Sequence, residues 1–222
     1  MKPISEEDFK KEHSKIYALI TETDNIKETL ILSSLFSILL ERFKKYIIET
    51  VDSFFASDFE QRNGKLTLLR GNSFKDLIKK YGKNDNGKHN CKDFRACTYF
   101  FLELGYMSQE DVDTANRYYD EKNNISHELY EIIADDKKQG VYIDDILTIY
   151  TIYKTVVRHW IREVEATTGM IEPEDYDNYD FDNAETIETI LLWRMIESAL
   201  KGIPAWDIIQ ETLEDSRNNN KK

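Results

Sequence analysis

The chain has 222 residues, of which 41% are hydrophobic and 32% charged, and its formal net charge is −12. This apolar content is enough for one sizeable core, while the negative charge argues against broad binding of nucleic acid or of an anionic membrane. The charged opening MKPISEEDFKKEH and the two cysteines indicate a cytoplasmic protein without a secretory signal. The longest apolar run, residues 30–40, is too short to span a bilayer.

Helical periodicity begins at once, in a chain with only 8 glycines and 3 prolines. Residues 5–20 predict a short amphipathic helix. Residues 25–55 predict the longest helix, which is apolar nearly all round in its middle and is therefore expected to be buried on several sides.

The next stretch, ASDFEQRNGKLTLLRGN, breaks the helical pattern, and no pair of strands is predicted there or elsewhere. A short helix is expected over residues 73–82, followed by a polar loop over 82–90. Residues 92–105 predict a helix that stops at Gly105.

A long helix is predicted from residue 109 to residue 132. Ser108 precedes it as an N-cap, and Glu110 and Asp111 lie in its first turn, where acidic side chains favour the helix dipole. Residues 137–140 predict a turn, and residues 143–166 predict another long helix.

The composition changes after Gly169, where MIEPEDYDNYDFDNAE is typical of an acidic linker. An amphipathic stretch follows at 187–196, a final short helix can begin at Pro204, and the end is expected to be disordered. The sequence therefore predicts an all-α protein. Residues 1–167 form an up-and-down helical bundle, and residues 168–222 form an acidic linker with a small C-terminal helical extension.

Charge is distributed unevenly along the chain. Residues 62–95 hold ten basic and three acidic side chains, whereas residues 168–217 hold thirteen acidic and three basic ones. One interpretation is that the basic residues lie on a solvated loop and on a surface helix. The other is a local surface that contacts phosphate and that the acidic tail masks.

Most motifs of enzymatic chemistry are missing, including a glycine-rich phosphate loop, HExxH and a nucleophile elbow. His89, Cys91 and Cys97 are close in sequence, but their spacing fits no familiar zinc site and a fourth ligand is lacking. Cys97 falls on the apolar side of its helix, so core packing explains it. We expect neither a metal nor a cofactor.

The stretch EKNNISHELYEII, residues 121–133, is the most distinctive. At 100° per residue, Asn116, Asp120, Asn123 and His127 lie within one narrow stripe of the predicted helix. Such a stripe can simply face water. Asparagine is nevertheless a poor helix former, and an aspartate–asparagine–histidine stripe can orient an imidazole for acid–base chemistry.

The region LELGYMSQEDVDTANRYYDEKNNISHEL resembles the signature of the HEPN superfamily, in which a hairpin and an acidic helix precede Arg-Asn-x-x-x-His. Here the motif reads KNNISH, with Asn123 and His127 matching and Lys122 at the arginine position. The resemblance covers roughly residues 20–167. A second, overlapping resemblance is to helical regulators of the mannitol-repressor type, which carry a degraded version of this motif.

The resemblance implies a helical bundle that dimerises. In active members, arginine and histidine from two protomers form one RNA-cleaving site that needs no metal. The histidine transfers protons around the ribose 2′-hydroxyl, and the arginine holds the phosphate. Carried over, the catalytic candidates are His127, Lys122, Asn123 and Asp120.

Lysine keeps the positive charge of arginine but loses the planar fork that binds phosphate bidentately. Two hypotheses therefore stay open. The first is a metal-independent toxin or phage-defence ribonuclease with a weakened site, acting on RNA and paired with a cognate antitoxin. The second is a non-catalytic HEPN-like binding or regulatory protein whose polar stripe contacts a partner. A homodimer is expected in either case, in part because Tyr118 and Tyr119 are expected to be exposed beside the motif.

Overall fold

The computed structural model describes most of the chain. The described residues are 5–21, 23–56, 58–62, 65–69, 71–83, 91–135, 138–169, 172 and 176–202. The chain divides into two compact units, Met1–Val156 and Val157–Lys222, and the division falls inside helix α7. It precedes the boundary predicted after residue 167, so the predicted linker and extension both belong to the second unit.

The first unit begins with three helices, α1 (Glu6–Glu12), α2 (Ser14–Thr21) and α3 (Thr23–Phe54). The single helix predicted over 5–20 is wrong in one respect, because the helix breaks at His13, whose φ and ψ are −137° and 53°. Helix α3 confirms the long helix predicted over 25–55.

A β-hairpin follows α3 and corrects the prediction that the chain has no paired strands. Strands β1 (Asp58–Arg62) and β2 (Lys65–Leu69) pair antiparallel, with Arg62 opposite Lys65. The two residues between them in the sequence are Asn63 and Gly64, and Asn-Gly is a preferred dipeptide for two-residue hairpin turns. Strand β2 is short and its apolar residues follow no helical period, so a search for helical periodicity missed this element.

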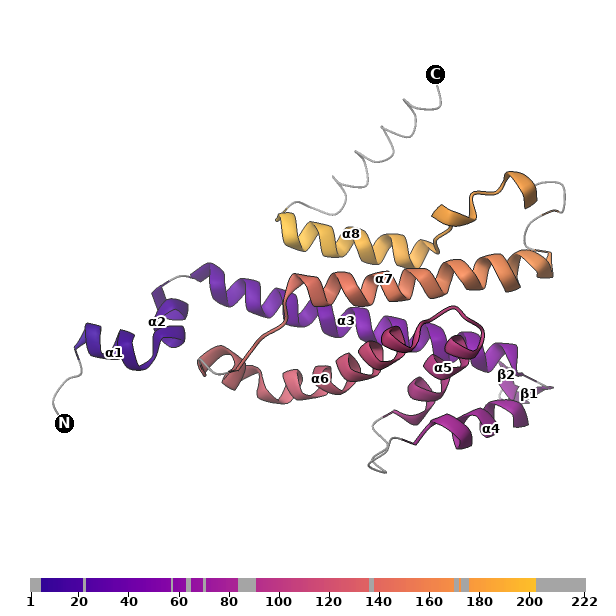
Figure 1. Cartoon of the computed structure of the whole chain (residues 1–222), viewed down its shortest axis with the longest axis horizontal. Coiled ribbons are helices and arrows are strands. Elements are labelled where there is room, and N and C mark those ends of the chain that lie inside the picture. The colour runs from indigo at the N-terminus through magenta and orange to yellow at the C-terminus, as the bar shows by residue number, and fades with distance from the viewer. Residues whose placement is uncertain are drawn as a thin grey trace, which may run out of the picture. The chain divides into compact units, whose positions relative to one another are not determined.

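Helices α4 (Asn72–Tyr81), α5 (Lys92–Glu103) and α6 (Gln109–Ala134) follow, as the sequence predicts. Helix α4 packs on α5, and both α5 and α6 contact α3. Helix α7 (Ile143–Trp160) begins in the first unit. Figure 1 shows α3 and the start of α7 running in one direction and α6 in the other, as in an up-and-down bundle. Apart from the hairpin, the described residues are all-α.

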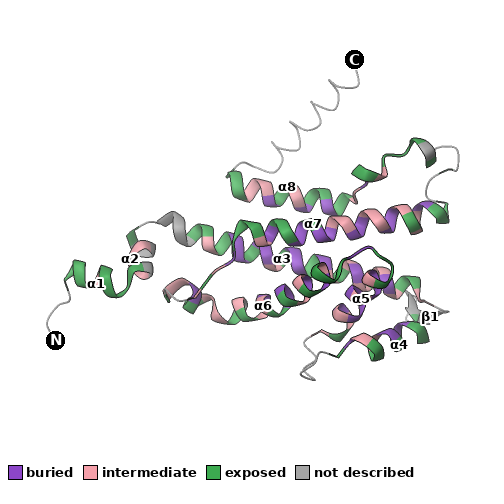
Figure 2. Cartoon of the chain, in the orientation of Figure 1, coloured by how far each residue is buried: buried purple, intermediate pink, exposed green. Residues whose placement is uncertain are grey.

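The core of the first unit is built around one face of α3. Leu39, Phe43, Ile47 and Val51 recur at helical spacing and are fully buried. The Phe43 ring lies 5.8 Å from Phe94 of α5 and 5.3 Å from Tyr153 of α7, measured between centroids. Figure 2 shows buried residues along α3 and α5, whereas α1 is mostly exposed. Burying each such side chain contributes about 1.5–3 kcal/mol.

The second unit continues α7 as a π-helical turn, Ile161–Glu165, and a 3-10 turn, Ala166–Thr168, which ends at Gly169 with φ +90°. Two 3-10 turns, Tyr176–Asn178 and Phe181–Asn183, precede α8 (Ile187–Lys201). Arg162 pairs with Asp182 at 2.6 Å and lies over the Phe181 ring. The helix predicted from Pro204 and the disordered end lie outside the described residues.

Candidate functional site on helix α6

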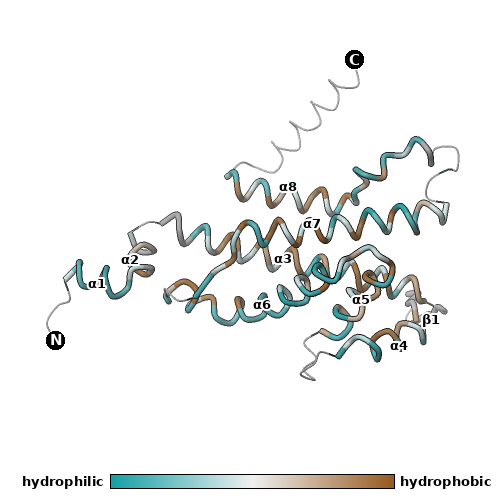
Figure 3. Tube along the Cα trace, viewed as in Figure 1, coloured by the Kyte–Doolittle hydropathy of each residue, from teal (hydrophilic) through white to brown (hydrophobic). Residues whose placement is uncertain are grey.

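Helix α6 carries the motif and is fixed at its start by a capping box. The Ser108 hydroxyl accepts from the Asp111 backbone N–H at 3.1 Å, and the Asp111 carboxylate accepts from the Ser108 backbone N–H at 2.8 Å. Gly105, with φ +77°, makes the preceding turn. The sequence predicted both the cap and the helix, which Figure 3 shows as mostly hydrophilic along its length.

The inner face of α6 differs from the prediction at two tyrosines. Tyr118 and Tyr119, expected to be exposed, are only 5% and 7% exposed. The Tyr118 ring packs edge-on against Phe36 at 5.3 Å, and its hydroxyl donates to the Asp145 carboxylate at 2.7 Å. Burial and this carboxylate raise the pKa of Tyr118. These two aromatic side chains therefore support the bundle and are not free to contact a second copy.

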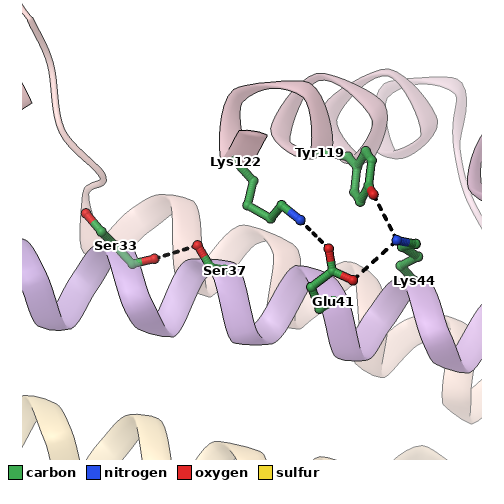
Figure 4. Close-up of polar contacts among 6 residues, drawn as sticks. All are labelled: Ser33, Ser37, Glu41, Lys44, Tyr119 and Lys122. Carbon is green, nitrogen blue, oxygen red and sulfur yellow. Dashed lines mark hydrogen bonds and ion pairs between the residues drawn. The ribbon is translucent and has the colours of Figure 1, made fainter. Parts of the chain in front are cut away.

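Lys122 is also on this inner face, and only 9% of it is exposed. Its ammonium forms an ion pair with Glu41 of α3. Glu41 is shared, since its second carboxylate oxygen lies 3.3 Å from the ammonium of Lys44, which in turn donates to the Tyr119 hydroxyl at 2.9 Å. Figure 4 shows Lys122 and Tyr119 reaching down from α6 to meet Glu41 and Lys44 on α3. We call these four residues the Glu41 cluster.

The charges in the Glu41 cluster stabilise one another. Burial alone would raise the pKa of Glu41, but hydrogen bonds and charge from Lys122 and Lys44 outweigh it and hold the pKa below its ordinary value of 4.5. For Lys44, burial would lower the pKa, but the Tyr119 hydroxyl and nearby negative charge raise it. Both lysine ammoniums also lie about 5 Å from the Tyr119 ring centroid, at 5.0 Å for Lys44 and 4.8 Å for Lys122.

The other three candidate residues lie away from the Glu41 cluster. Asp120 and His127 are exposed, and Asn123 is half-buried. In the described part of the chain, His127 makes no hydrogen bond or ion pair. His127 is five positions after Lys122, so on an ideal helix the two side chains point about 140° apart. The structure therefore does not bring Lys122 and His127 of one chain together.

The first residue of the polar stripe predicted on α6, Asn116, does not lie with the exposed residues of the stripe. Asn116 faces inward, where its amide donates to the Thr98 hydroxyl at 3.0 Å and to the Val112 carbonyl at 2.8 Å. The helix is also interrupted at Glu128, whose φ and ψ are −108° and 18°. This break comes directly after His127, so the helical face that carries the stripe ends there.

A pocket of about 330 Å³ lies beside this break. Its lining mixes apolar and charged side chains and includes two ion pairs, Arg117 with Glu121 at 3.0 Å and Lys138 with Glu128. Its lining comprises Phe36, Arg117, Glu121, Asn124, Ile125, Glu128, Ile132, Lys138, Gln139, Gly140, Val141, Tyr142 and Asp145. Neither Lys122 nor His127 lines it, so the pocket is separate from the predicted site.

Sequence reasoning missed Glu41 and Lys44. Both stand in the strongly helical run of α3, and nothing local marks Glu41 as the partner of a lysine 81 residues further along. Within the described residues, no group of three or more His, Cys, Asp or Glu side chains is arranged to hold a metal ion. Cys97 is fully buried, which confirms its predicted place in the core.

Neither a protein-family model, nor a curated protein, nor a solved structure matches this chain. Among the helices that the structure describes, none combines the length and the apolar content needed to cross a membrane.

Proposed function

We propose that this chain is a non-catalytic binding or regulatory protein built on a HEPN-like helical bundle. The observation that carries the proposal is the position of Lys122, which is buried against α3 and paired with Glu41. A cation that anchors phosphate has to be free to approach the substrate. In this chain the ammonium at the arginine position of the motif already holds a carboxylate.

The energetics support the same proposal. The Lys122 side chain is only 11% exposed, and taking the carboxylate away from a cation that water reaches poorly is destabilising. A phosphate could recruit Lys122 only by displacing Glu41, and Glu41 also holds Lys44. The Glu41 cluster therefore explains Lys122 as a residue that fixes α6 on α3, without any role in catalysis.

The second candidate is the metal-independent ribonuclease with a weakened site. What favours it is the exposure of His127 and Asp120 on α6, with Asn123 between them in the sequence. In that case the RNA substrate and a cognate antitoxin are the expected partners, and a second protomer has to complete the site. The homodimer stays a prediction without Tyr118 and Tyr119 as contacts, and Tyr130, three positions after His127 in the sequence, is 76% exposed.

The two candidates are separated by incubating RNA with wild type, His127→Ala and Lys122→Arg, each with and without a chelator. The non-catalytic proposal expects intact RNA in every reaction. Glu131→Ala is the matched control, because Glu131 is exposed one turn beyond His127. Cleavage that survives in Glu131→Ala, is lost in His127→Ala and increases in Lys122→Arg would establish the ribonuclease instead.

A further inference from the structure

Helices α4 and α5 together present a row of cations and tyrosines on one side. Lys92, Arg95, Tyr99 and Glu103 are spaced by three, four and four residues, so they share one face of α5. Tyr81 at the end of α4 stacks on Tyr99, with centroids 5.0 Å apart and planes 6° apart. The stack ties the two helices together and fixes the side chains around it.

Cations cover both outer sides of this tyrosine stack. The Arg95 guanidinium lies over the Tyr99 ring at 5.4 Å from its centroid, and the Lys80 ammonium lies over the Tyr81 ring at 4.4 Å. Glu103 accepts from both Lys80, at 2.9 Å, and the Tyr81 hydroxyl. The far end of the row is thus neutralised, while the end with Lys92 and Arg95 is not.

Three cations at that end form no ion pair within the described residues, and the acid nearest to two of them in the sequence is Asp93. Lys83 and Lys92 are exposed and form no ion pair or hydrogen bond there. Arg95 forms no ion pair there either, and its Nε is buried without an acceptor. A Cβ added to Gly82 would lie only 2.9 Å from the Cβ of Lys92, so the backbone directly before Lys83 approaches the start of α5 closely.

The balance of charge makes this face unusual for the chain. The described residues 71–83 and 91–103 hold six basic and three acidic side chains, a net charge of +3 in a protein whose total is −12. Two of the six, Lys79 and Lys80, are paired with Asp76 and Glu103. A local positive face on an acidic protein attracts a polyanion, while the rest of the surface does not bind polyanions non-specifically.

We infer that this face binds the phosphodiester backbone of a nucleic acid through Lys83, Lys92 and Arg95. Both tyrosine rings are already covered on their outer sides, so they do not offer a platform on which bases stack. Contacts are made to phosphate, and binding is insensitive to base sequence. Arg95 is held against Tyr99 before binding, which reduces the entropy lost when its guanidinium meets a phosphate.

A nucleic acid is favoured over an acidic protein because α5 sets the spacing between Lys92 and Arg95. Lys92 and Arg95 are one helical turn apart and Arg95 is braced by a ring, which suits a ligand whose charges recur at a regular spacing. The inference does not depend on the motif in α6. Residues 84–90, which lie outside the described residues, are not part of the proposed face.

The test measures binding of a labelled single-stranded RNA oligonucleotide to the full chain by fluorescence anisotropy at several salt concentrations. Three phosphate contacts predict that log K falls with log salt with a slope of about −2, since each contact to a single strand contributes about −0.7. The double variant Lys83→Gln, Lys92→Gln removes two contacts, so the magnitude of its slope should decrease to about 0.7.

The control variant is Lys11→Gln with Lys45→Gln. It removes the same charge from exposed lysines on α1 and α3, outside the proposed face. It should bind as wild type does, apart from a small uniform loss through net charge. Urea unfolding of each variant shows that the fold is intact, which is expected because all four lysines are exposed.

The same binding experiment is repeated with duplex DNA and with poly-glutamate, each at the same concentration of negative charge as the RNA. Binding of either nucleic acid, with loss in the Lys83/Lys92 variant alone, supports the inference, and the comparison of RNA with DNA identifies which one is preferred. Absence of binding at low salt, equal loss in both variants, or tighter binding of poly-glutamate would overturn it. Because the readout is binding, failure here leaves the outcome of the cleavage experiment unaffected.

Discussion

Lys122 of α6 and Glu41 of α3 form an ion pair although 81 residues separate them in the chain. The pair is unequal in exposure, since the Lys122 side chain is 11% exposed and that of Glu41 is 47% exposed. Loss of the carboxylate would therefore leave a cation that water reaches poorly.

Glu41→Gln is expected to destabilise the chain by about 1–3 kcal/mol, the range for leaving a buried donor without its partner. Urea unfolding at neutral pH measures the change. The control is Glu49→Gln, whose partner Lys45 lies 3.9 Å away with both side chains well exposed. That change should cost less than about 0.5 kcal/mol. Equal effects of the two substitutions would show that the Glu41 cluster does not hold α6 on α3.

The same pair predicts a pH dependence. The pKa of Glu41 is lowered by Lys122 and Lys44 against the opposing effect of burial, so its contribution is complete above the ordinary value of 4.5. It is lost as the pH falls through the lower pKa of the folded state. The difference in unfolding free energy between wild type and Glu41→Gln should thus shrink in acid. Urea titrations from pH 7 to pH 3 measure this difference, and a gap that stays constant would contradict the prediction.

The start of α6 gives a prediction about helix capping. Ser108→Ala removes the side chain of the capping box and should cost about 1 kcal/mol, which lowers the melting temperature by about 2–4 °C in a chain of this size. Ser5 caps α1 in a similar way, accepting from the Asp8 backbone at 3.2 Å, but α1 has no buried residue. Ser5→Ala should leave global unfolding unchanged in thermal melts, because α1 contributes little to the cooperative core.

Glu165 in the π-helical turn gives a prediction of opposite sign. Burial raises its pKa above the ordinary value of 4.5. Below that value Glu165 is protonated in both states and costs the folded state nothing. The protein loses stability as the pH rises through the raised pKa, because the charged carboxylate is poorly solvated in the folded state. Glu165→Gln should therefore stabilise the protein at neutral pH and have little effect in acid.

Unfolding of Glu165→Gln by urea at pH 7 and pH 4 checks this prediction. Glu163→Gln is the matched control, since Glu163 is exposed in the same turn. A destabilised Glu165→Gln at pH 7 would indicate that the carboxylate of Glu165 is needed as an acceptor.

The sequence by itself determined most of the helices and some of their limits. Ser108 and Asp111 set the start of α6, Gly105 sets the end of the element before it, and the apolar spacing of α3 selects the face with Leu39 and Phe43. These features depend on backbone conformation and on neighbours within four residues, which a local pattern contains. The hairpin was also present in the sequence as Asn63-Gly64, a turn signal that a search for helical periodicity does not weigh.

Only the tertiary structure decided where the motif residues lie. Lys122 and His127 are the first and last residues of KNNISH, but the helix turns them about 140° apart, and α3 then covers Lys122 and not His127. The same packing buries Tyr118 and Tyr119 and turns Asn116 toward Thr98. A single sequence gives the angle between two residues on one helix. It does not give which side of that helix another helix will occupy, because that depends on contacts between segments as far apart as Glu41 and Lys122.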